Sequence, residues 1–419
     1  MFKENRNNYL KELKEQSISI FYSGRAQHKS ADQKFPFVVN RNFFYLTGIE
    51  QQESVVLLIK GNQTTKTLLF IEKQDPLKAL WDGETLSFKE AANIAGLEEN
   101  ECLDIATLDT YLAQYLGHTR RSLYGTIENL YFDLERHGLN EPKSISEQEA
   151  NRIKDLYPHL AIYNGYPIVS ELRKVKSEFE VNQIKKAISI TKDALEGVMQ
   201  KLKPGKYEYQ VEADYDYTLS YNNVKPSFDT IAAAGKNATV LHYVDNDYKI
   251  GDNELILLDL GVSYQNYCSD ISRTYPASGK YTEQQKQIYE IVLEANKKTI
   301  EWVKAGHTYK EFNDYGRNIL IAGMKRLGLI KEDSEINKYY YHSLGHYLGL
   351  DVHDVGNTTK VIPAGAILTV EPGLYIAELG IGIRIEDNIL ITEGKAINLS
   401  KDLIKEVSDI EAYMAKNKK

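Results

Sequence analysis

Short apolar runs alternate with helical patterns through the first 170 or so residues of the chain. SISIFYSG, ESVVLLIKG, KTLLFIEKQ and SLYGTI have strand length and strand-favouring residues, whereas SFKEAANIAG has apolar residues at helical spacing. Such alternation is typical of a domain in which helices cover a sheet. We therefore predict an N-terminal α/β domain over residues 1–172.

Long amphipathic helices replace this pattern after residue 172. Three capping boxes mark their starts: Ser177 with Glu180, Thr282 with Gln285, and Thr308 with Glu311. The first helix has an apolar face, formed by Val181, Ile184, Ile188, Leu195 and Val198, and it ends at Pro204 and Gly205. The change of pattern predicts a second domain over residues 173–419.

Two strand pairs in the second domain share one pattern. The first reads ELILLDLG and, after a turn, NYCSDISRTY; the second reads GAILTVEPG and then IGIRIEDNIL. In each pair an apolar strand ends in an acid, Asp259 or Glu371, and glycine stands two residues further on. The next strand carries a second acid, Asp270 or Glu386. This repeat predicts a duplicated, pseudo-symmetric α+β domain in which the four acids face a common centre.

Composition and charge exclude several classes of protein. The 419 residues carry a net charge of −8 without a basic block, which argues against nucleic acid as a partner. The apolar runs fall well short of the roughly 20 residues that cross a bilayer, and the polar N-terminus lacks the apolar core of a secretory signal. Cys102 and Cys268 alone make no disulfide framework. We therefore expect a cytoplasmic protein without membrane contact.

The four acids are candidates for metal binding. A single acid at a strand end is more often a turn residue that accepts hydrogen bonds from nearby amides. Asp259, Glu371 and Glu386, however, each border an apolar run that should be buried, where an unpaired carboxylate is costly. Arg273 and Arg384 cannot neutralise four carboxylates, whereas two divalent ions can. The charge balance therefore predicts a dinuclear metal site.

Three of the nine histidines lie in the stretch HSLGHYLGLDVHDVG, residues 342–356. His342 and His346 have the spacing of the two ligands in an HExxH zinc helix, but Ser343 stands in place of the glutamate of that motif. Gly345 and Gly349 disfavour a regular helix. One imidazole added to four carboxylates makes an oxygen-rich site that suits Mn²⁺, with Co²⁺, Zn²⁺ or Fe²⁺ as competitors.

These motifs also resemble a known family. LLDLG, SDISRTYP, HSLGHYLGLDVHDVG, LTVEPGLY and GIGIRIEDNILIT, in this order, are similar to the ligand motifs of the pita-bread metallopeptidases, and among them of aminopeptidase P. SADQKFPFVVNRNFFYLTGI and LLFIEKQDPLKALWDGE resemble the N-terminal domain of that group. The resemblance implies an α/β two-domain chain, with a pita-bread catalytic domain after an N-terminal domain of the aminopeptidase P type.

The resemblance implies five metal ligands. Asp270 and Glu386 would bridge two divalent ions, Asp259 would complete the shell of one ion, and His346 and Glu371 would complete the shell of the other. The loop that carries His346 departs from the family pattern, because the family generally has His-Gly-x-Ser-His where this chain has His-Ser-Leu-Gly-His.

The implied activity is release of the N-terminal residue from peptides with proline in the second position. Two ions that share a water would lower its pKa and hold the carbonyl oxygen, and Glu371 would carry the proton to the leaving nitrogen. His242 and His353, which match two non-ligand histidines of the family, would hydrogen-bond the substrate carbonyl. Arg384 and His342 would orient the groups around the ions.

The N-terminal domain would help to measure substrate length, and the working form would be a homodimer or homotetramer. Trp81 in LKALWDGE matches an aromatic residue that reaches a neighbouring subunit's active site in aminopeptidase P, although ordinary packing is the alternative for a tryptophan. Asp32 in SADQKF lies in the other matched stretch.

Two other functions are compatible with the same fold. Prolidase is the main alternative, since it shares the fold, the ligands and the metals but accepts only dipeptides. A catalytically inactive binding protein is a weaker alternative, because loss of one or more ligands would be its expected trace and all five are present.

Overall fold

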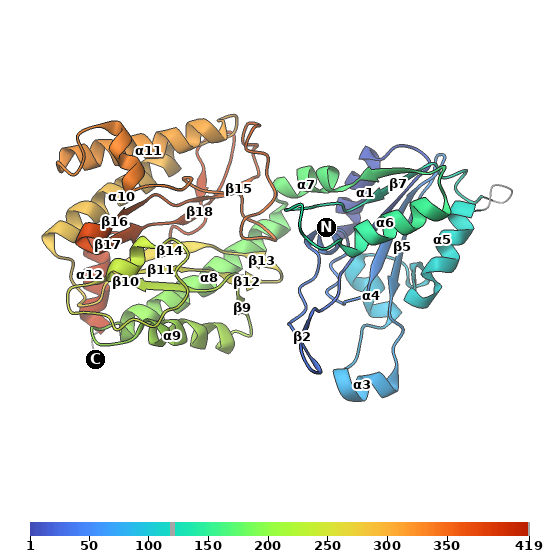
Figure 1. Ribbon diagram of the computed structural model, residues 1–419, viewed down its shortest axis with the longest axis horizontal. Coiled ribbons are helices and arrows are strands. Elements are labelled where there is room, and N and C mark those ends of the chain that lie inside the picture. The colour runs from blue at the N-terminus through green and yellow to red at the C-terminus, as the bar shows by residue number, and fades with distance from the viewer. Residues whose placement is uncertain (118–121, 418–419) are drawn as a thin grey trace. The chain divides into compact units, whose positions relative to one another are not determined.

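The computed structural model describes residues 1–117 and 122–417. The chain divides into two compact units, Met1–Arg173 and Lys174–Lys419. Figure 1 shows that each unit combines strands with covering helices. Among the described residues, no helix combines the length and the apolar character that a membrane crossing requires.

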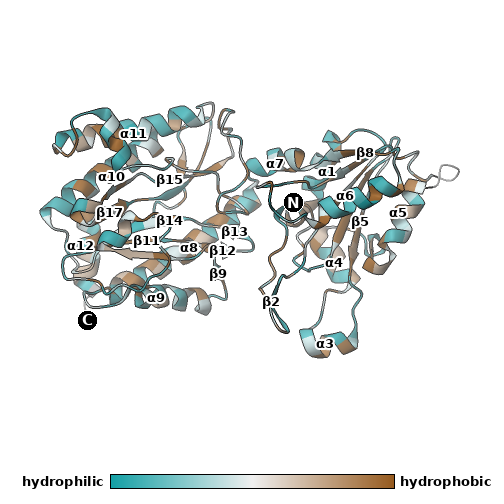
Figure 2. Ribbon diagram, viewed as in Figure 1, coloured by the Kyte–Doolittle hydropathy of each residue, from teal (hydrophilic) through white to brown (hydrophobic). Residues whose placement is uncertain are grey.

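One mixed sheet forms the core of the N-terminal unit. Its strand order is β6-β5-β4-β1-β7-β8, and β1 is parallel to β7 but antiparallel to β4. Most apolar side chains of the four inner strands are buried, and Figure 2 shows the hydrophobic residues of this sheet in brown. The strands are β1 (Ser17–Tyr22), β4 (Val55–Lys60), β5 (Thr65–Ile71), β6 (Cys102–Asp104), β7 (Asn129–Phe132) and β8 (Ala161–Asn164).

Helices pack on this sheet through apolar faces, such as Leu112 and Leu116 of α5 and Ala150 and Ile153 of α6. The helices are α1 (Phe2–Glu12), α2 (Arg41–Thr47), α3 (Pro76–Asp82), α4 (Phe88–Ala95), α5 (Leu108–Gly117), α6 (Ile145–Leu156) and α7 (Tyr166–Lys174). A small hairpin, β2 (His28–Ser30) with β3 (Gln33–Lys34), lies outside the sheet.

The strand predicted at SLYGTI is wrong. Leu123 and Gly125 form only an isolated bridge, and the next strand, β7, begins at Asn129. Gly125 has a φ of +80°, a left-handed conformation that interrupts a ladder. The other three predicted strands are β1, β4 and β5, and the predicted helix is α4.

The second unit contains two successive arrangements of two helices followed by a strand pair. The first half comprises α8 (Glu178–Lys201), α9 (Glu208–Tyr221), β9 (Lys225–Pro226), β10 (Ile231–Ala234), β11 (Leu255–Leu260), β12 (Val262–Tyr264), β13 (Tyr267–Cys268) and β14 (Ile271–Pro276). The second half comprises α10 (Glu283–Trp302), α11 (Tyr309–Arg326), β15 (Ile367–Val370), β16 (Gly373–Ile376), β17 (Ile381–Arg384), β18 (Asp387–Leu390) and β19 (Ile397–Asn398), and α12 (Val407–Asn417) follows.

The predicted fold class is confirmed. Ser177, Thr282 and Thr308 each cap the helix that the sequence placed there, and each completes a capping box. Figure 1 shows the strands of this unit between the α8–α9 pair and the α10–α11 pair. The two strand pairs therefore meet in the middle of the unit, where the chain can bring the four acids together.

Candidate metal centre

The four predicted acids converge from both halves of the second unit. Asp259 lies in β11, Asp270 directly before β14, Glu371 directly after β15, and Glu386 between β17 and β18. The hydroxyl of Ser272 on β14 is 3.1 Å from Asp259 Oδ1 and donates to Glu386 Oε2 at 2.8 Å. One hydroxyl thus contacts a carboxylate from each half.

His346 faces these acids through its Nε2 atom. Nε2 is 3.2 Å from Asp270 Oδ2 and 3.7 Å from Glu371 Oε1. The other ring nitrogen, Nδ1, lies 3.0 Å from the carbonyl oxygen of Tyr347. When a histidine donates its Nδ1–H to a carbonyl, the lone pair on Nε2 is available to bind a metal ion or a proton.

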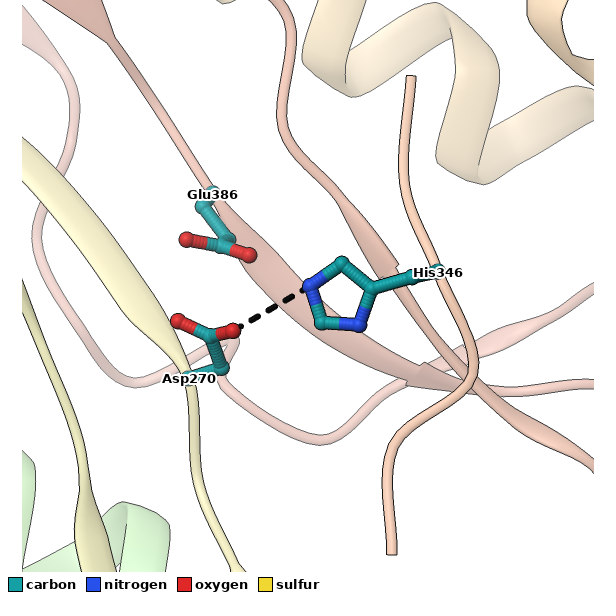
Figure 3. A group of neighbouring side chains, drawn as sticks. All are labelled: Asp270, His346 and Glu386. Carbon is teal, nitrogen blue, oxygen red and sulfur yellow. Dashed lines mark ion pairs between the residues drawn. The ribbon is translucent and has the colours of Figure 1, made fainter. Parts of the chain in front are cut away.

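Asp270, His346 and Glu386 form a compact group of possible metal ligands. Each offers one ligand atom, and these atoms lie within 4.8 Å of one another. Figure 3 shows the three side chains pointing toward one another from separate parts of the chain. Asp270, His346 and Glu386 are therefore close enough to share a cation, whereas Asp259 and Glu371 lie outside this group of possible ligands.

The four acids outnumber the positive charges beside them, which are Arg384 and the imidazolium of His346. Burial raises the pKa of Asp270, raises that of Glu371 to about 7, and raises that of Glu386 well above its usual range. Glu386 Oε1 is buried and accepts no hydrogen bond from the described residues. For His346, burial lowers the pKa, but the hydrogen bond to Asp270 and the charge of Glu371 outweigh it, and the pKa rises to about 9. Without metal, the imidazolium supplies charge that a divalent cation would replace. This donor set fits such a cation.

Arg384 is buried beside the acids and holds Asp259. Its Nη2 atom is 2.6 Å from Asp259 Oδ2, and its Nε donates to Ser272 Oγ at 2.7 Å. Its Nη1 donates to the hydroxyl of Tyr375 at 2.8 Å. A single guanidinium therefore connects one acid to two hydroxyl groups.

His342 and His346 belong to a loop, so the zinc-helix geometry is absent, as the two glycines predicted. His342 Nε2 is 2.8 Å from the Tyr375 hydroxyl, and its Nδ1 is 3.8 Å from Glu371 Oε2. Burial, followed by the charge of Arg384, lowers the pKa of His342 to about 4. The imidazole is therefore neutral at pH 7 and can accept the hydrogen bond from Tyr375.

His353 and His242 lie at the exposed side of the group. The His353 ring centroid is 4.1 Å from that of His346, and both His353 and His242 are exposed. Burial, then the charges of His346 and His242, lowers the pKa of His353 to about 4. These two exposed imidazoles thus flank the acids on the solvent side.

Trp81 and Asp32 belong to the N-terminal unit, whereas every other predicted site residue belongs to the second unit. Trp81 lies on α3 and is 89% exposed, which argues against the packing alternative within this chain. Asp32 is exposed in the turn between β2 and β3. Both elements lie at the same end of the N-terminal unit (Figure 1).

Known proteins that are similar to this chain identify its family. The model of metallopeptidase family M24 matches residues 182–393, and that of the aminopeptidase P N-terminal domain matches residues 2–124. The Xaa-Pro aminopeptidase of Haemophilus influenzae is 33% identical, over 99% of this chain and 96% of that protein. The chain belongs to metallopeptidase family M24.

Solved structures of this family have the same fold. Zinc-substituted Escherichia coli aminopeptidase P in complex with product has a TM-score of 0.89 at 30% identity, and the match covers 100% of this chain and 98% of that one. A suggested aminopeptidase P from Bacillus anthracis has a TM-score of 0.96 at 42% identity, with the same coverage. The family that the ligand motifs predicted is therefore confirmed.

Sequence reasoning missed Ser272 and Tyr375 in this M24 site. Each lies an even number of residues after an acid in an extended segment, Ser272 two after Asp270 and Tyr375 four after Glu371. Side chains two or four apart in a strand face the same side. The same spacing relates Arg384 to Glu386, two residues later, and it would have found Ser272 and Tyr375 as well.

Proposed function

We propose that the chain is a metal-dependent Xaa-Pro aminopeptidase, which releases the N-terminal residue from peptides with proline in the second position. One observation carries this proposal: a buried group of Asp270, His346 and Glu386 lies in a chain whose relatives over its full length are Xaa-Pro aminopeptidases. Peptides with an Xaa-Pro N-terminus would be the substrates.

Five side chains would hold two divalent ions. Asp270 and Glu386 would be shared, Asp259 would complete one shell, and His346 and Glu371 the other. Glu386 Oε1 supports this arrangement. This oxygen is buried beside the other acids and accepts no hydrogen bond from the described residues, so a cation would satisfy it. Oxygen-rich ligands favour Mn²⁺, with Co²⁺, Zn²⁺ or Fe²⁺ as competitors. Bound ions would supply Lewis acidity, which makes water nucleophilic at neutral pH and polarises the scissile carbonyl.

Glu371 would move the proton. Hydrolysis requires a base that takes a proton from water and an acid that returns it to the leaving nitrogen. Burial raises the pKa of Glu371 to about 7, so this carboxyl can hold or release a proton near neutral pH before any ion binds. Contacts of His342 Nδ1 with the Ser343 carbonyl and of Nε2 with the Tyr375 hydroxyl would hold this imidazole beside Glu371, whose Oε2 is 3.8 Å from Nδ1.

His353 and His242 would bind the substrate carbonyl. Both are exposed beside the acids, and neither is in the group of possible ligands. An imidazole N–H can donate to the carbonyl oxygen and stabilise negative charge on it as that charge develops. Arg384 and Tyr375 would keep Asp259 and His342 in place through their hydrogen bonds.

The N-terminal unit would contribute substrate-length selection and subunit contacts. All residues of α3 are at least partly exposed, and Leu77, Leu80 and Trp81 are 74%, 81% and 89% exposed. Exposed aromatic and aliphatic side chains on one short helix suit a contact with another subunit, in a homodimer or homotetramer. Asp32, on the β2–β3 turn at the same end of the unit, would act with α3 (Figure 1).

We also propose a cytoplasmic location. Cys102 and Cys268 are both buried and belong to different units, which suits a reducing compartment. Cys268 Sγ contacts the carbonyl oxygen of Leu350 at 3.6 Å, as expected of a packed thiol.

Hydrolysis assays test the proposed function. The peptides are Arg-Pro-Pro, longer Xaa-Pro peptides, the dipeptide Gly-Pro, and matched peptides with alanine in the second position. The proposal expects release of the first residue from Arg-Pro-Pro and longer Xaa-Pro peptides, and little from the alanine series. Cleavage of Gly-Pro alone would instead identify a prolidase, and no cleavage with Mn²⁺ present would favour the inactive scaffold.

The role of Trp81 has its own test. Trp81→Ala should weaken hydrolysis of tripeptides and longer substrates while metal content stays at the wild-type level. Leu156→Ala, at an exposed apolar position on α6 of the same unit, is the matched control. A fully active monomer by light scattering at assay concentration would rule out the shared site.

A further inference from the structure

The two glutamates lie where the strand ladders of the second half are interrupted. The β15–β18 ladder ends at the pair Val370 and Asp387, and the β16–β17 ladder begins at Gly373 and Arg384. Glu371, Pro372, Ile385 and Glu386 stand between the two ladders, outside any strand. Backbone groups at such an interruption need partners other than the ladder, because buried carbonyls are almost always hydrogen-bonded.

One side chain supplies two of those partners. Asn296 on α10 donates from Nδ2 to the carbonyl oxygen of Val370 at 3.0 Å and to that of Ile385 at 3.2 Å. Val370 directly precedes Glu371, and Ile385 directly precedes Glu386. The single amide group of Asn296 thus ties together the two peptide units from which the glutamates extend.

The rest of the amide is also used. Asn296 Oδ1 accepts from Lys405 Nζ at 2.7 Å, and Lys405 also pairs with Asp387, the residue after Glu386. Asn296 is 0% exposed. Asparagine is a poor helix former and a buried amide is costly unless it is bonded. Its neighbours on the buried face of α10 include Val292, Ala295 and Ile300, so an apolar residue would suit that face better.

We propose that Asn296 is a positioning residue that fixes the separation of Glu371 and Glu386, so that both carboxylates can hold the one divalent ion that they would share. The inference rests on the metal dependence in the proposed function. It assigns to α10 a part in metal binding through hydrogen bonds to the backbone, without any contact between Asn296 and the ions.

The competing view is that Asn296 only anchors α10 to the strands. Both views predict lower stability when Asn296 is replaced, so stability does not separate them. They differ in metal affinity of the folded protein, because only a positioning residue changes the geometry of the two glutamates. Replacement of a residue that orients metal ligands typically weakens metal binding by about 10-fold to 100-fold.

The test uses two variants of the full chain. Asn296→Leu removes both donors and the acceptor with little change of size. Asn296→Asp keeps the shape and the partner for Lys405 but removes both donors, and its added negative charge would by itself strengthen cation binding. The matched control is Thr299→Val in the same helix, since Thr299 is 0% exposed and its hydroxyl has no hydrogen-bond partner among the described residues.

The measurements are calorimetric titration of each metal-free protein with Mn²⁺, and thermal unfolding of the same metal-free samples. We expect both Asn296 variants to bind Mn²⁺ about 10-fold or more weakly, and Thr299→Val to bind as the wild type does. If Asn296→Asp binds Mn²⁺ like the wild type, the inference is overturned, even where the unfolding temperature falls. If the wild type itself binds no Mn²⁺, the metal dependence in the proposed function is wrong. This result differs from wild-type affinity in Asn296→Asp, which would overturn only the role of Asn296.

Discussion

The two strand pairs of the second unit have the same pattern of acids, but one pair forms a continuous ladder and the other an interrupted one. The β11–β14 ladder runs without interruption from Leu255–Pro276 to Leu260–Ile271, and Asp259 is paired inside it with Ser272. The corresponding pair in the second half is divided into the β15–β18 and β16–β17 ladders, and both glutamates lie between them.

The difference changes what fixes each carboxylate. In a continuous ladder the side-chain direction follows from the strand itself, so the strand directs Asp259 toward the hydrogen bonds of Arg384 and Ser272. At the interruption, hydrogen bonds from other elements must do this. Arg273 on β14 donates from Nη1 to the carbonyl of Glu386 at 2.6 Å, and its Nη2 pairs with Asp387 at 2.8 Å. The regular first half thus supports the irregular second half.

Metal removal tests whether the acids of both halves form one site, and it has the largest expected effect. A chelator should abolish hydrolysis and Mn²⁺ should restore it best, because four carboxylates need a cation in common.

His346→Ala should retain less metal and lose measurable activity, while His159→Ala in the N-terminal unit serves as the control. Elemental analysis of the purified proteins decides. Full activity of the metal-free wild type would contradict the site.

Alanine at the glycine of each acid-x-Gly motif compares the two backbones directly. A Cβ on Gly261 would lie 1.9 Å from the carbonyl oxygen of Ser269, whereas one on Gly373 would meet the Tyr375 hydroxyl at 2.5 Å. A side chain can move more easily than a backbone carbonyl. We expect Gly261→Ala to lower the free energy of unfolding by about 3 kcal/mol and Gly373→Ala by about 1 kcal/mol. Urea unfolding measures both, and equal losses would show that the two halves respond alike.

Each half also contributes a histidine outside the ligand set, His242 from the first and His353 from the second. Replacing either with alanine should reduce kcat/KM by about 10²-fold, the scale for loss of one oxyanion donor, with metal content unchanged. Loss of metal from either variant would reassign that histidine as a ligand. A much larger effect for one of the two would show that the halves do not share carbonyl binding equally.

Features of this unit that depend on neighbouring residues were predictable from the sequence, whereas features that depend on long-range contacts were not. The capping boxes at Ser177, Thr282 and Thr308 gave three helix starts because capping depends on neighbours three residues apart. The acids were recognisable from buried strands that end in a charge. Their ligand roles and those of His242 and His353 came from family resemblance and remain predictions.

The interruption at Glu371 and Glu386 was not predictable from the strand pattern. Its cause lies in contacts between distant parts of the chain, such as Asn296 with Val370 and Ile385. An asparagine in the middle of an apolar helix face gives no sign of its partners. The same holds for Arg273, whose contacts with Glu386 and Asp387 join residues more than 100 positions apart.

Replacement of Ser272 has the smallest expected effect. Its hydroxyl contacts an acid from each half of the unit. It contacts Asp259 in the first half and Glu386 in the second, and it accepts from Arg384 Nε. Ser272→Ala removes these bonds and leaves the β11–β14 ladder intact. We expect the affinity for Mn²⁺ to fall by about 10-fold, the lower end of the range for groups that orient metal ligands.

Ser272→Thr is the matched control, since it keeps the hydroxyl and suits a strand. Titration of the metal-free proteins with Mn²⁺ should rank the wild type and Ser272→Thr together, above Ser272→Ala. Ser272→Ala with wild-type affinity would mean that Arg384 and the ladder alone hold Asp259, and that the two halves orient their carboxylates independently. A loss in both variants would instead indicate that the space around Ser272, and not its hydrogen bonds, controls the site.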